Sequence, residues 1–192
     1  MKKNLFSLAL VAMLGVASVQ SASAQAKMTP AGTVMVGGEA MYANKNIVEN
    51  AVNSKDHTTL VAAVKAAGLV ETLQGKGPFT VFAPTNAAFN ALPAGTVETL
   101  VKPESKATLT KILTYHVVAG NMTADKIMAA IKAGKGTAAL KTVSGGTLTA
   151  TMNGPKNVVL TDEKGNVSTI STYDVLQSNG VIHVIDKVLM PK

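Results

Sequence analysis

The 192-residue sequence contains no cysteine, no tryptophan and no arginine. Without cysteine, no disulfide can stabilise the fold, which must be held together by packing alone. A lipid-modified N-terminal cysteine is excluded for the same reason. The eighteen basic residues are all lysines, which lack the planar guanidinium fork that binds phosphate in two places. Because these lysines are scattered and no aromatics are interleaved with them, the sequence argues against specific nucleic-acid binding.

Aromatic residues are also scarce, at 4% of the chain, whereas hydrophobic residues make up 47% and charged residues 15%. The core must therefore consist mainly of Val, Leu, Ile and Ala. This length and composition fit one globular domain with a sizeable core. The formal net charge of +7 indicates either a solvated basic surface or a loose attraction to anionic polymers such as an envelope polysaccharide.

The N-terminal residues have the pattern of a secretory signal peptide. Lys2 and Lys3 precede an apolar run over residues 5–19, and the small residues Ala22, Ser23 and Ala24 follow. A basic start, an apolar stretch and a small-residue cleavage site are typical of such signals. The apolar run is shorter than the ~20 residues that a membrane span needs. We therefore expect residues 1–24 to be a signal peptide and the mature protein to be periplasmic or extracellular, without a membrane-spanning segment.

Residues 25–44 lack periodicity and contain Gly and Pro, which predicts a flexible leader. Met28, Met35 and Met41 lie in this segment. Thioethers are soft ligands that can select Cu(I). Copper handling by these methionines, together with His57, is therefore an alternative function, although methionines in such a leader can also be simple apolar filler.

Residues 79–92 (FTVFAPTNAAFNAL) predict a buried strand, a sharp turn and the start of a helix. Three of the four phenylalanines, Phe79, Phe82 and Phe89, lie in this stretch, so we expect the core to form around it. Pro84 ends the strand because it has no N–H to donate. Either Thr85 or Asn86 can cap the helix that follows.

The remainder of residues 45–191 predicts an α+β domain. Helical spacing of apolar residues dominates up to about residue 131, and alternating apolar and polar residues follow from about residue 140. Most helices thus precede most strands, which favours α+β over a regular βαβ array.

Three segments of this region resemble the motifs of the fasciclin domain family. They are residues 80–89, the pair Tyr115 and His116, and residues 174–186, which include Asn179, Gly180 and His183. The resemblance covers about residues 45–191 and is closest to the short, secreted, single-domain bacterial type. It implies a compact β-wedge with helices packed around its edge and with the two long motifs side by side near its centre. It also implies an adhesion or binding role, with an envelope or extracellular protein as partner.

The resemblance further implies interaction candidates. In animal matrix relatives, cell attachment has been assigned to the Tyr-His pair, here Tyr115 and His116. It has also been assigned to an acidic-apolar triplet before the last strand, here Asp174, Val175 and Leu176. The triplet has Val where the animal relatives have Ile.

The same residues also have a structural interpretation. His116 is expected to be buried and bonded to a neighbour around Thr85 or Asn86, and Tyr115 to be half-buried with its hydroxyl bonded. Asp174 would cap a turn, with Val175 and Leu176 facing the core. Two further histidines are expected to contact solvent, His183 on the outer face of the sheet and His57 in a polar loop.

The sequence lacks the motifs of common catalytic and metal sites. It has no Gly-x-Ser-x-Gly elbow, no Ser-x-x-Lys pair and no His-Glu-x-x-His, and its three histidines are far apart. We therefore expect no enzyme, no cofactor and no metal site in the domain. A hydrolase whose site is assembled from distant residues is the remaining catalytic alternative.

Overall fold

The computed structural model describes residues 33–192. The predicted signal peptide and Met28 lie outside the described residues. Within them, no helix has both the length and the apolar character to cross a membrane. The helices are α1 (Ile47–Ala51), α2 (Thr58–Ala67), α3 (Val70–Gln74), α4 (Asn86–Asn90), α5 (Thr96–Leu100), α6 (Lys106–Tyr115) and α7 (Ala124–Ala133), with 3-10 turns at Lys55–His57 and Pro103–Ser105.

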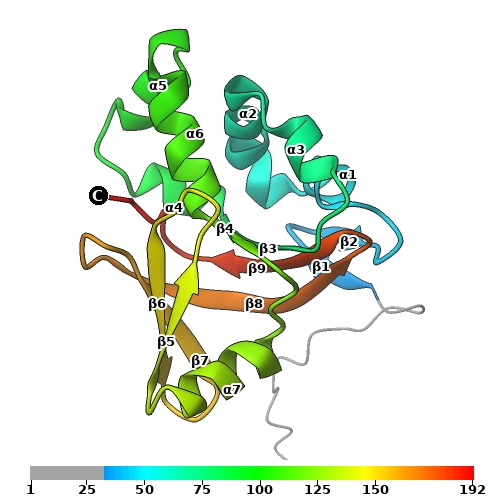
Figure 1. Cartoon of the computed structure of the whole chain (residues 1–192). Helices are drawn as coiled ribbons and strands as arrows, with labels where there is room; N and C mark the ends of the chain where they lie inside the picture. The colour runs from blue at the N-terminus through cyan, green and yellow to red at the C-terminus, as the bar shows by residue number, and fades with distance from the viewer. Residues whose placement is uncertain (1–32) are drawn as a thin grey trace, which may run out of the picture.

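The strands build a two-stranded hairpin and a seven-stranded sheet. The hairpin pairs β1 (Val34–Val36) with β2 (Glu39–Met41), and the sheet has the order β4-β3-β9-β8-β7-β6-β5. Helices α1 to α6 lie over one side of this sheet, whereas α7 lies on the other side (Figure 1). The sheet strands are β3 (Phe79–Pro84), β4 (Val117–Ala119), β5 (Thr137–Lys141), β6 (Thr147–Asn153), β7 (Asn157–Thr161), β8 (Val167–Gln177) and β9 (Gly180–Ile185).

The centre of the sheet is a parallel pair of strands from opposite ends of the domain. Phe79 pairs with Gly180, Phe82 with His183 and Pro84 with Ile185. The predicted adjacency of the two long motifs is therefore confirmed. All other strand pairs in the sheet are antiparallel.

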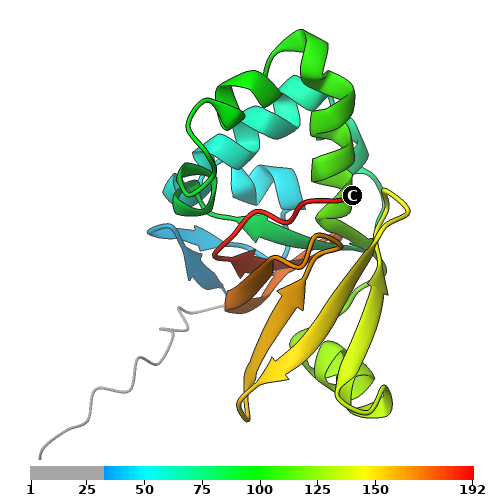
Figure 2. The same ribbon diagram turned by 90° about the vertical axis from the view of Figure 1, so that its left-hand side faces the viewer.

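Strand β8 is longer than the sequence predicts, because the triplet expected to precede the last strand is itself part of a strand. It pairs with β7 through residues 167–169 and with β9 from Ile170 to Gln177. Two register shifts, between Ile170 and Thr172 and between Thr172 and Val175, interrupt the pairing with β9. Such irregularities bend a strand and increase its twist. Accordingly, β5, β6 and β7 turn away from the helical layer (Figure 2).

The two edges of the curled sheet approach each other. Val118 of β4 forms a bridge with Thr142, just after β5, and the Val143 N–H donates to the Val117 carbonyl at 2.7 Å. The sheet is therefore nearly barrel-like.

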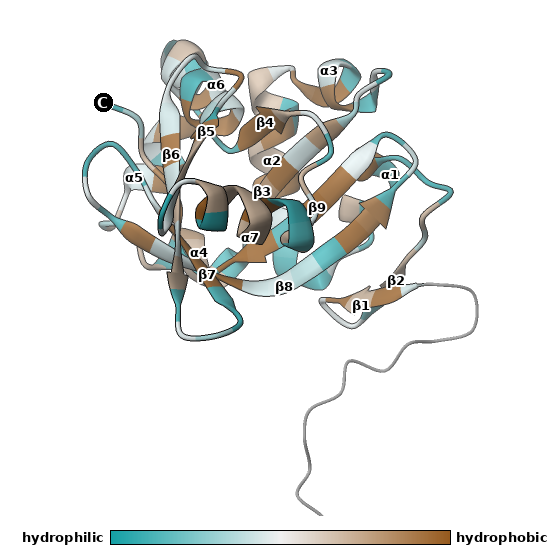
Figure 3. Cartoon of the chain, turned by 60° about the horizontal axis from the view of Figure 1, so that its bottom comes forward, coloured by the Kyte–Doolittle hydropathy of each residue, from teal (hydrophilic) through white to brown (hydrophobic). Residues whose placement is uncertain are grey.

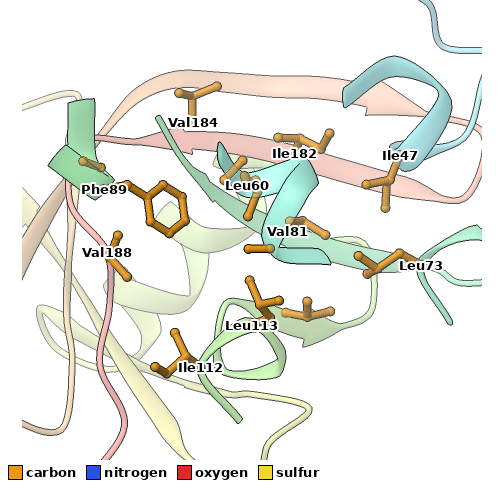
Figure 4. Close-up of a cluster of buried hydrophobic side chains, with 14 of the residues drawn as sticks. Ile47, Leu60, Leu73, Val81, Phe89, Ile112, Leu113, Ile182, Val184 and Val188 are labelled. Carbon is orange, nitrogen blue, oxygen red and sulfur yellow. The ribbon is translucent and has the colours of Figure 1, made fainter. Parts of the chain in front are cut away.

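The buried apolar side chains form two clusters, one on each face of the central strands. The first lies between the sheet and the helices α1 to α6, where side chains from both layers converge (Figure 4). The second fills the curl of the sheet beneath α7, which crosses the central strands when the molecule is viewed from below (Figure 3). Val81 belongs to the first cluster and Phe82 to the second. Because β3 and β9 are covered on both faces, their sequences are mainly apolar rather than alternating.

Residues 34–41 do not form the flexible leader that the sequence suggested for this part of the chain. They form the β1–β2 hairpin, and Val36 and Met41 pack into the first cluster. The short strands give too few residues for an alternating pattern to be recognised. Gly37 and Gly38, both with positive φ, make the turn between them.

Candidate functional site

The pair Tyr115 and His116 lies at the junction of α6 and β4, inside the protein. The His116 Nδ1–H donates to the Ile112 carbonyl at 2.9 Å, and Nε2 accepts from the Leu189 N–H at 2.9 Å. These partners require the neutral ring with its proton on Nδ1. Burial lowers the pKa of His116 to about 4, against smaller opposing effects of the Ile112 carbonyl and the Asp162 carboxylate. The predicted burial is therefore correct, but the neighbours are Ile112 and Leu189 rather than Thr85 or Asn86.

Tyr115 is fully buried, not half-buried as expected. Its hydroxyl donates to the Thr147 carbonyl at 2.8 Å and accepts from the Glu163 N–H at 3.1 Å. Burial raises the pKa of Tyr115 to about 12, opposed by the Glu163 N–H. A side chain at Gly146 would begin 2.7 Å from the tyrosine ring, so only glycine leaves room for it. Tyr115 thus connects α6 to β6 and to the loop after β7.

Asp174 acts as a helix cap supplied by a distant strand. The N-cap residue of α7, Thr123, makes no side-chain cap. Asp174 Oδ1 instead accepts from the Ala124 N–H at 2.8 Å. Asp174 has a φ of 53°, a left-handed conformation that Asp and Asn tolerate better than most residues. The predicted capping role is confirmed, although the capped element is a helix rather than a turn.

His183 lies behind Asp174 and is fully buried, which corrects the prediction that it faces solvent. Its Nδ1 accepts from the Asp174 N–H at 3.3 Å, and its Nε2–H donates to the Met122 carbonyl at 2.8 Å. The ring stacks on Phe82 and meets Tyr173 edge-on. Burial lowers the pKa of His183, with the Met122 carbonyl and Asp174 acting in the opposite direction. The prediction failed because it treated β9 as a strand with one solvated face.

Val175 and Leu176 point in opposite directions, as neighbours in a strand must. Val175 is buried as predicted, whereas Leu176 is 47% exposed, contrary to the prediction that both face the core. Of the five interaction candidates, Leu176 is the only exposed one, and Asp174 is partly exposed.

The turn between β8 and β9 is held by Asn179. Its Nδ2 donates to the carbonyls of Leu73 at 2.8 Å and Gly75 at 3.0 Å, and its Oδ1 accepts from the Ile47 N–H at 3.0 Å. At Gly180, a side chain would begin 2.0 Å from the Phe79 carbonyl oxygen, so the central parallel pair requires glycine here.

A shallow hollow of about 360 Å³ lies beside this turn and next to Leu176 in the chain. It is lined by Lys76, Pro78, Asn121, Gln177, Ser178, Asn179 and Gly180. The hollow and the exposed side chain of Leu176 both lie at the end of β8, and we call the two features together the turn surface.

The two capping residues after β3, Thr85 and Asn86, cap different helices. Thr85 Oγ1 accepts from the Ala88 N–H at 3.3 Å and so caps α4, as predicted. Asn86 instead caps a different helix, because its Oδ1 accepts from the Thr59 N–H at 3.0 Å and its Nδ2 donates to the Lys55 carbonyl at 2.8 Å. Sequence reasoning recognised Asn86 as a capping type but could not identify a helix 27 positions upstream as its target.

A buried polar contact that the sequence analysis missed joins α1 to the end of β8. Asn50 donates through Nδ2 to the Tyr42 carbonyl and to Gln177 Oε1. Asn50 and Gln177 are each typical of exposed positions, so no local pattern marks them as partners.

Of the residues proposed for copper that the structure describes, Met41 and His57 line one apolar pocket, whereas Met35 does not. Met35 and Met41 occupy opposite faces of the hairpin, with Met35 43% exposed and Met41 buried in the core. His57 is buried rather than solvated, with its Nδ1 2.8 Å from Ser54 Oγ. Within residues 33–192, no group of three His, Cys, Asp or Glu side chains could hold a metal ion.

The sequence matches a known domain family and several known proteins. The family model described as "Fasciclin domain" matches residues 55–191. The Synechocystis sp. protein named Protein sll1483 is 46% identical over 184 residues, which cover 95% of this chain and 94% of that protein. The cell surface glycolipoprotein MPB83 of Mycobacterium bovis is 36% identical over 171 residues, covering 86% of this chain and 68% of its own length.

A solved structure has the same fold. The FAS1 domain pair from the insect cell adhesion molecule fasciclin I superposes with a TM-score of 0.66 at 17% sequence identity. The match covers 76% of this chain and 51% of that chain. At this identity the likeness establishes the fold alone.

Proposed function

The chain belongs to the fasciclin domain family, and on that premise we propose that it is a non-catalytic interaction module exported to the cell envelope or the extracellular space. Its partner is an envelope or extracellular protein or an anionic polysaccharide. A relative that is 36% identical supports this proposal, because it is named a cell surface glycolipoprotein.

The distribution of the motif residues carries the proposal. Tyr115, His116 and Val175 are buried, and Asp174 caps a helix. Each of these side chains therefore has a structural role and offers little accessible surface to a partner. Leu176 has no such task, because its side chain is 47% exposed although it belongs to a family motif. We therefore assign the partner contact to the turn surface.

The lysines favour an anionic component in the partner. Loss of Lys2 and Lys3 with a signal peptide would change the net charge from +7 to +5. Among residues 33–192, a single salt bridge is present, between Lys55 and Glu39 at 3.4 Å. Most of the ammonium groups are therefore available to a polyanion, an attraction that salt screens.

The test is attachment of the purified protein, immobilised on beads, to envelope fragments from the organism that encodes it. We expect saturable binding that a leucine-to-serine change at position 176 reduces at least fivefold. Protease treatment of the fragments identifies a protein partner, and loss of binding after periodate oxidation identifies a polysaccharide. Failure to bind intact fragments or matrix extracts would contradict the proposal.

A further inference from the structure

A separate, strongly apolar pocket lies between the helical layer and the sheet, away from the turn surface. Its floor is formed by side chains of β3, β4 and β9, and its walls by α1, α2, α3 and α6. The cavity has a volume of about 90 Å³. Apolar cavities of roughly this order, about 150 Å³, stay dry and take up small hydrophobic molecules.

The pocket extends along α2. His57, immediately before the helix, and Lys65, in its last turn, both line it. Eight residues of helix correspond to about 12 Å at 1.5 Å per residue. The lining therefore follows α2 over most of the length of this helix.

The inner end of the pocket contains an unsatisfied polar atom. His57 is only 3% exposed, and its Nε2 forms no hydrogen bond within the described residues, although the Ala83 carbonyl lies nearby. Burial lowers the pKa of His57, so the neutral ring is favoured. A neutral ring can line a pocket that receives a hydrocarbon chain.

The outer end is positively charged. Lys65 belongs to the lining. Lys106 Nζ lies 3.4 Å from the point where a Cβ atom at position 68 would stand, and Gly68 directly precedes the lining residue Leu69. Neither lysine takes part in the one salt bridge formed within residues 33–192. Two exposed ammonium groups outside that salt bridge thus lie near the C-terminal end of α2, one on a lining residue and the other beside Gly68.

We propose that this pocket binds a medium-chain carboxylate, with its alkyl chain under α2 and its carboxylate between Lys65 and Lys106. The apolar lining would contact the alkyl chain of the ligand, and the two ammonium groups would attract its carboxylate. The proposal is independent of the partner contact at the turn surface, so either can fail without the other.

The test is titration of the purified protein with butanoate, hexanoate and octanoate, followed by amide chemical shifts and by the His57 ring signals. We expect affinity to increase severalfold with each two-carbon extension, with shifts in α2, α3 and α6. Octyltrimethylammonium should bind at least tenfold more weakly than octanoate, because it places a cation beside two lysines.

Substitutions test the contacts to the carboxylate and to the alkyl chain of the ligand separately. The double variant Lys65→Gln/Lys106→Gln should weaken octanoate binding three- to tenfold and leave octanol binding unchanged within twofold. The matched control Lys132→Gln/Lys141→Gln removes the same charge from α7, which lies on the other side of the sheet (Figure 1), and from the edge strand β5. It should leave the binding of both ligands unchanged. Val64→Phe, which fills a half-buried wall position, should weaken binding of both ligands.

The proposal is overturned if octanoate shifts no signal in the lining elements. It is equally overturned if affinity does not depend on chain length, or if the control double variant weakens octanoate as much as Lys65→Gln/Lys106→Gln does.

Discussion

At the scale of single residues, the family motifs of this chain are explained by interior contacts. Each of the histidines His57, His116 and His183 is buried, and burial lowers the pKa of each. The two motif histidines, His116 and His183, use both ring nitrogens to tie separate elements together. In the folded protein these rings are therefore neutral, and their protonation would destabilise the folded state.

The stability of the protein should therefore fall as the pH falls. In the unfolded chain His116 binds a proton near pH 6.5, whereas in the folded chain it does so only near pH 4. The unfolded state thus binds more protons between these values, and stability present above pH 6.5 is lost as the pH decreases towards 4. For His116 alone the loss is roughly 3 kcal/mol, measurable as the denaturant-unfolding free energy at pH 7.5 and pH 4.5.

The His116→Gln variant is the control for this pH dependence. Glutamine can donate to the Ile112 carbonyl and accept from the Leu189 N–H without titrating. Its unfolding free energy should vary less with pH than that of the wild type. An equal pH dependence in both proteins would show that His116 is not the group responsible.

Phe82 provides a second test at this scale. Its side chain projects from β3 into the second cluster, where it is fully buried and stacks on His183. Phe82→Ala should lower the unfolding free energy by about 3–5 kcal/mol. Val101→Ala, at an exposed position, should change it by less than about 0.5 kcal/mol. A denaturant midpoint that is the same for Phe82→Ala and wild type would contradict the packing described.

At the scale of elements, the sequence was informative wherever a local rule decides the structure. The cap at Thr85 and the strand ending at Pro84 both follow from neighbouring residues. The same local reading failed for the extension of β8, for the β1–β2 hairpin and for the target of Asn86. The target of Asn86 lies 27 positions away in the chain, outside any local window of sequence. The register shifts in β8 and the short strands of the hairpin instead leave no regular alternation of apolar and polar residues to recognise.

Helix α7 depends on such a distant partner. Asp174→Ala removes the only side-chain cap described for the first N–H of this helix and places alanine at a positive φ. We expect a loss of about 1–2 kcal/mol in unfolding free energy and faster hydrogen exchange in the first turn of α7. Asp174→Asn keeps the oxygen and tolerates the backbone conformation, and should recover most of the loss. Unchanged exchange in Asp174→Ala would contradict the capping role.

The hairpin gives a matched pair of substitutions. Met41 is 3% exposed and packs against the first cluster, whereas Met35 is 43% exposed on the other face. Met41→Ala should destabilise the protein by roughly 2–5 kcal/mol, and Met35→Ala by less than about 0.5 kcal/mol, as measured by thermal or denaturant unfolding. Equal and small effects would restore the flexible-leader interpretation for residues 34–41.

At the scale of the whole molecule, the fold could be predicted from the sequence, but the orientation of the site residues could not. The three motifs identified the family and the adjacency of β3 and β9, which the register confirms. Which side of a strand faces solvent depends on what covers the sheet, and here both faces of β9 are covered. That is why His183 was expected outside. Leu176 was expected inside because its segment was not recognised as part of the strand β8.

The central claim is that the motifs build the interior while the turn surface carries the function. It is tested most directly by measuring attachment to envelope fragments per folded molecule for wild type, Leu176→Ser and His116→Gln. We predict that Leu176→Ser keeps the wild-type unfolding midpoint and loses at least four fifths of the attachment. We also predict that His116→Gln unfolds more easily yet attaches normally while folded. A Leu176→Ser variant that attaches like wild type, beside a folded His116→Gln variant that does not attach, would contradict the account.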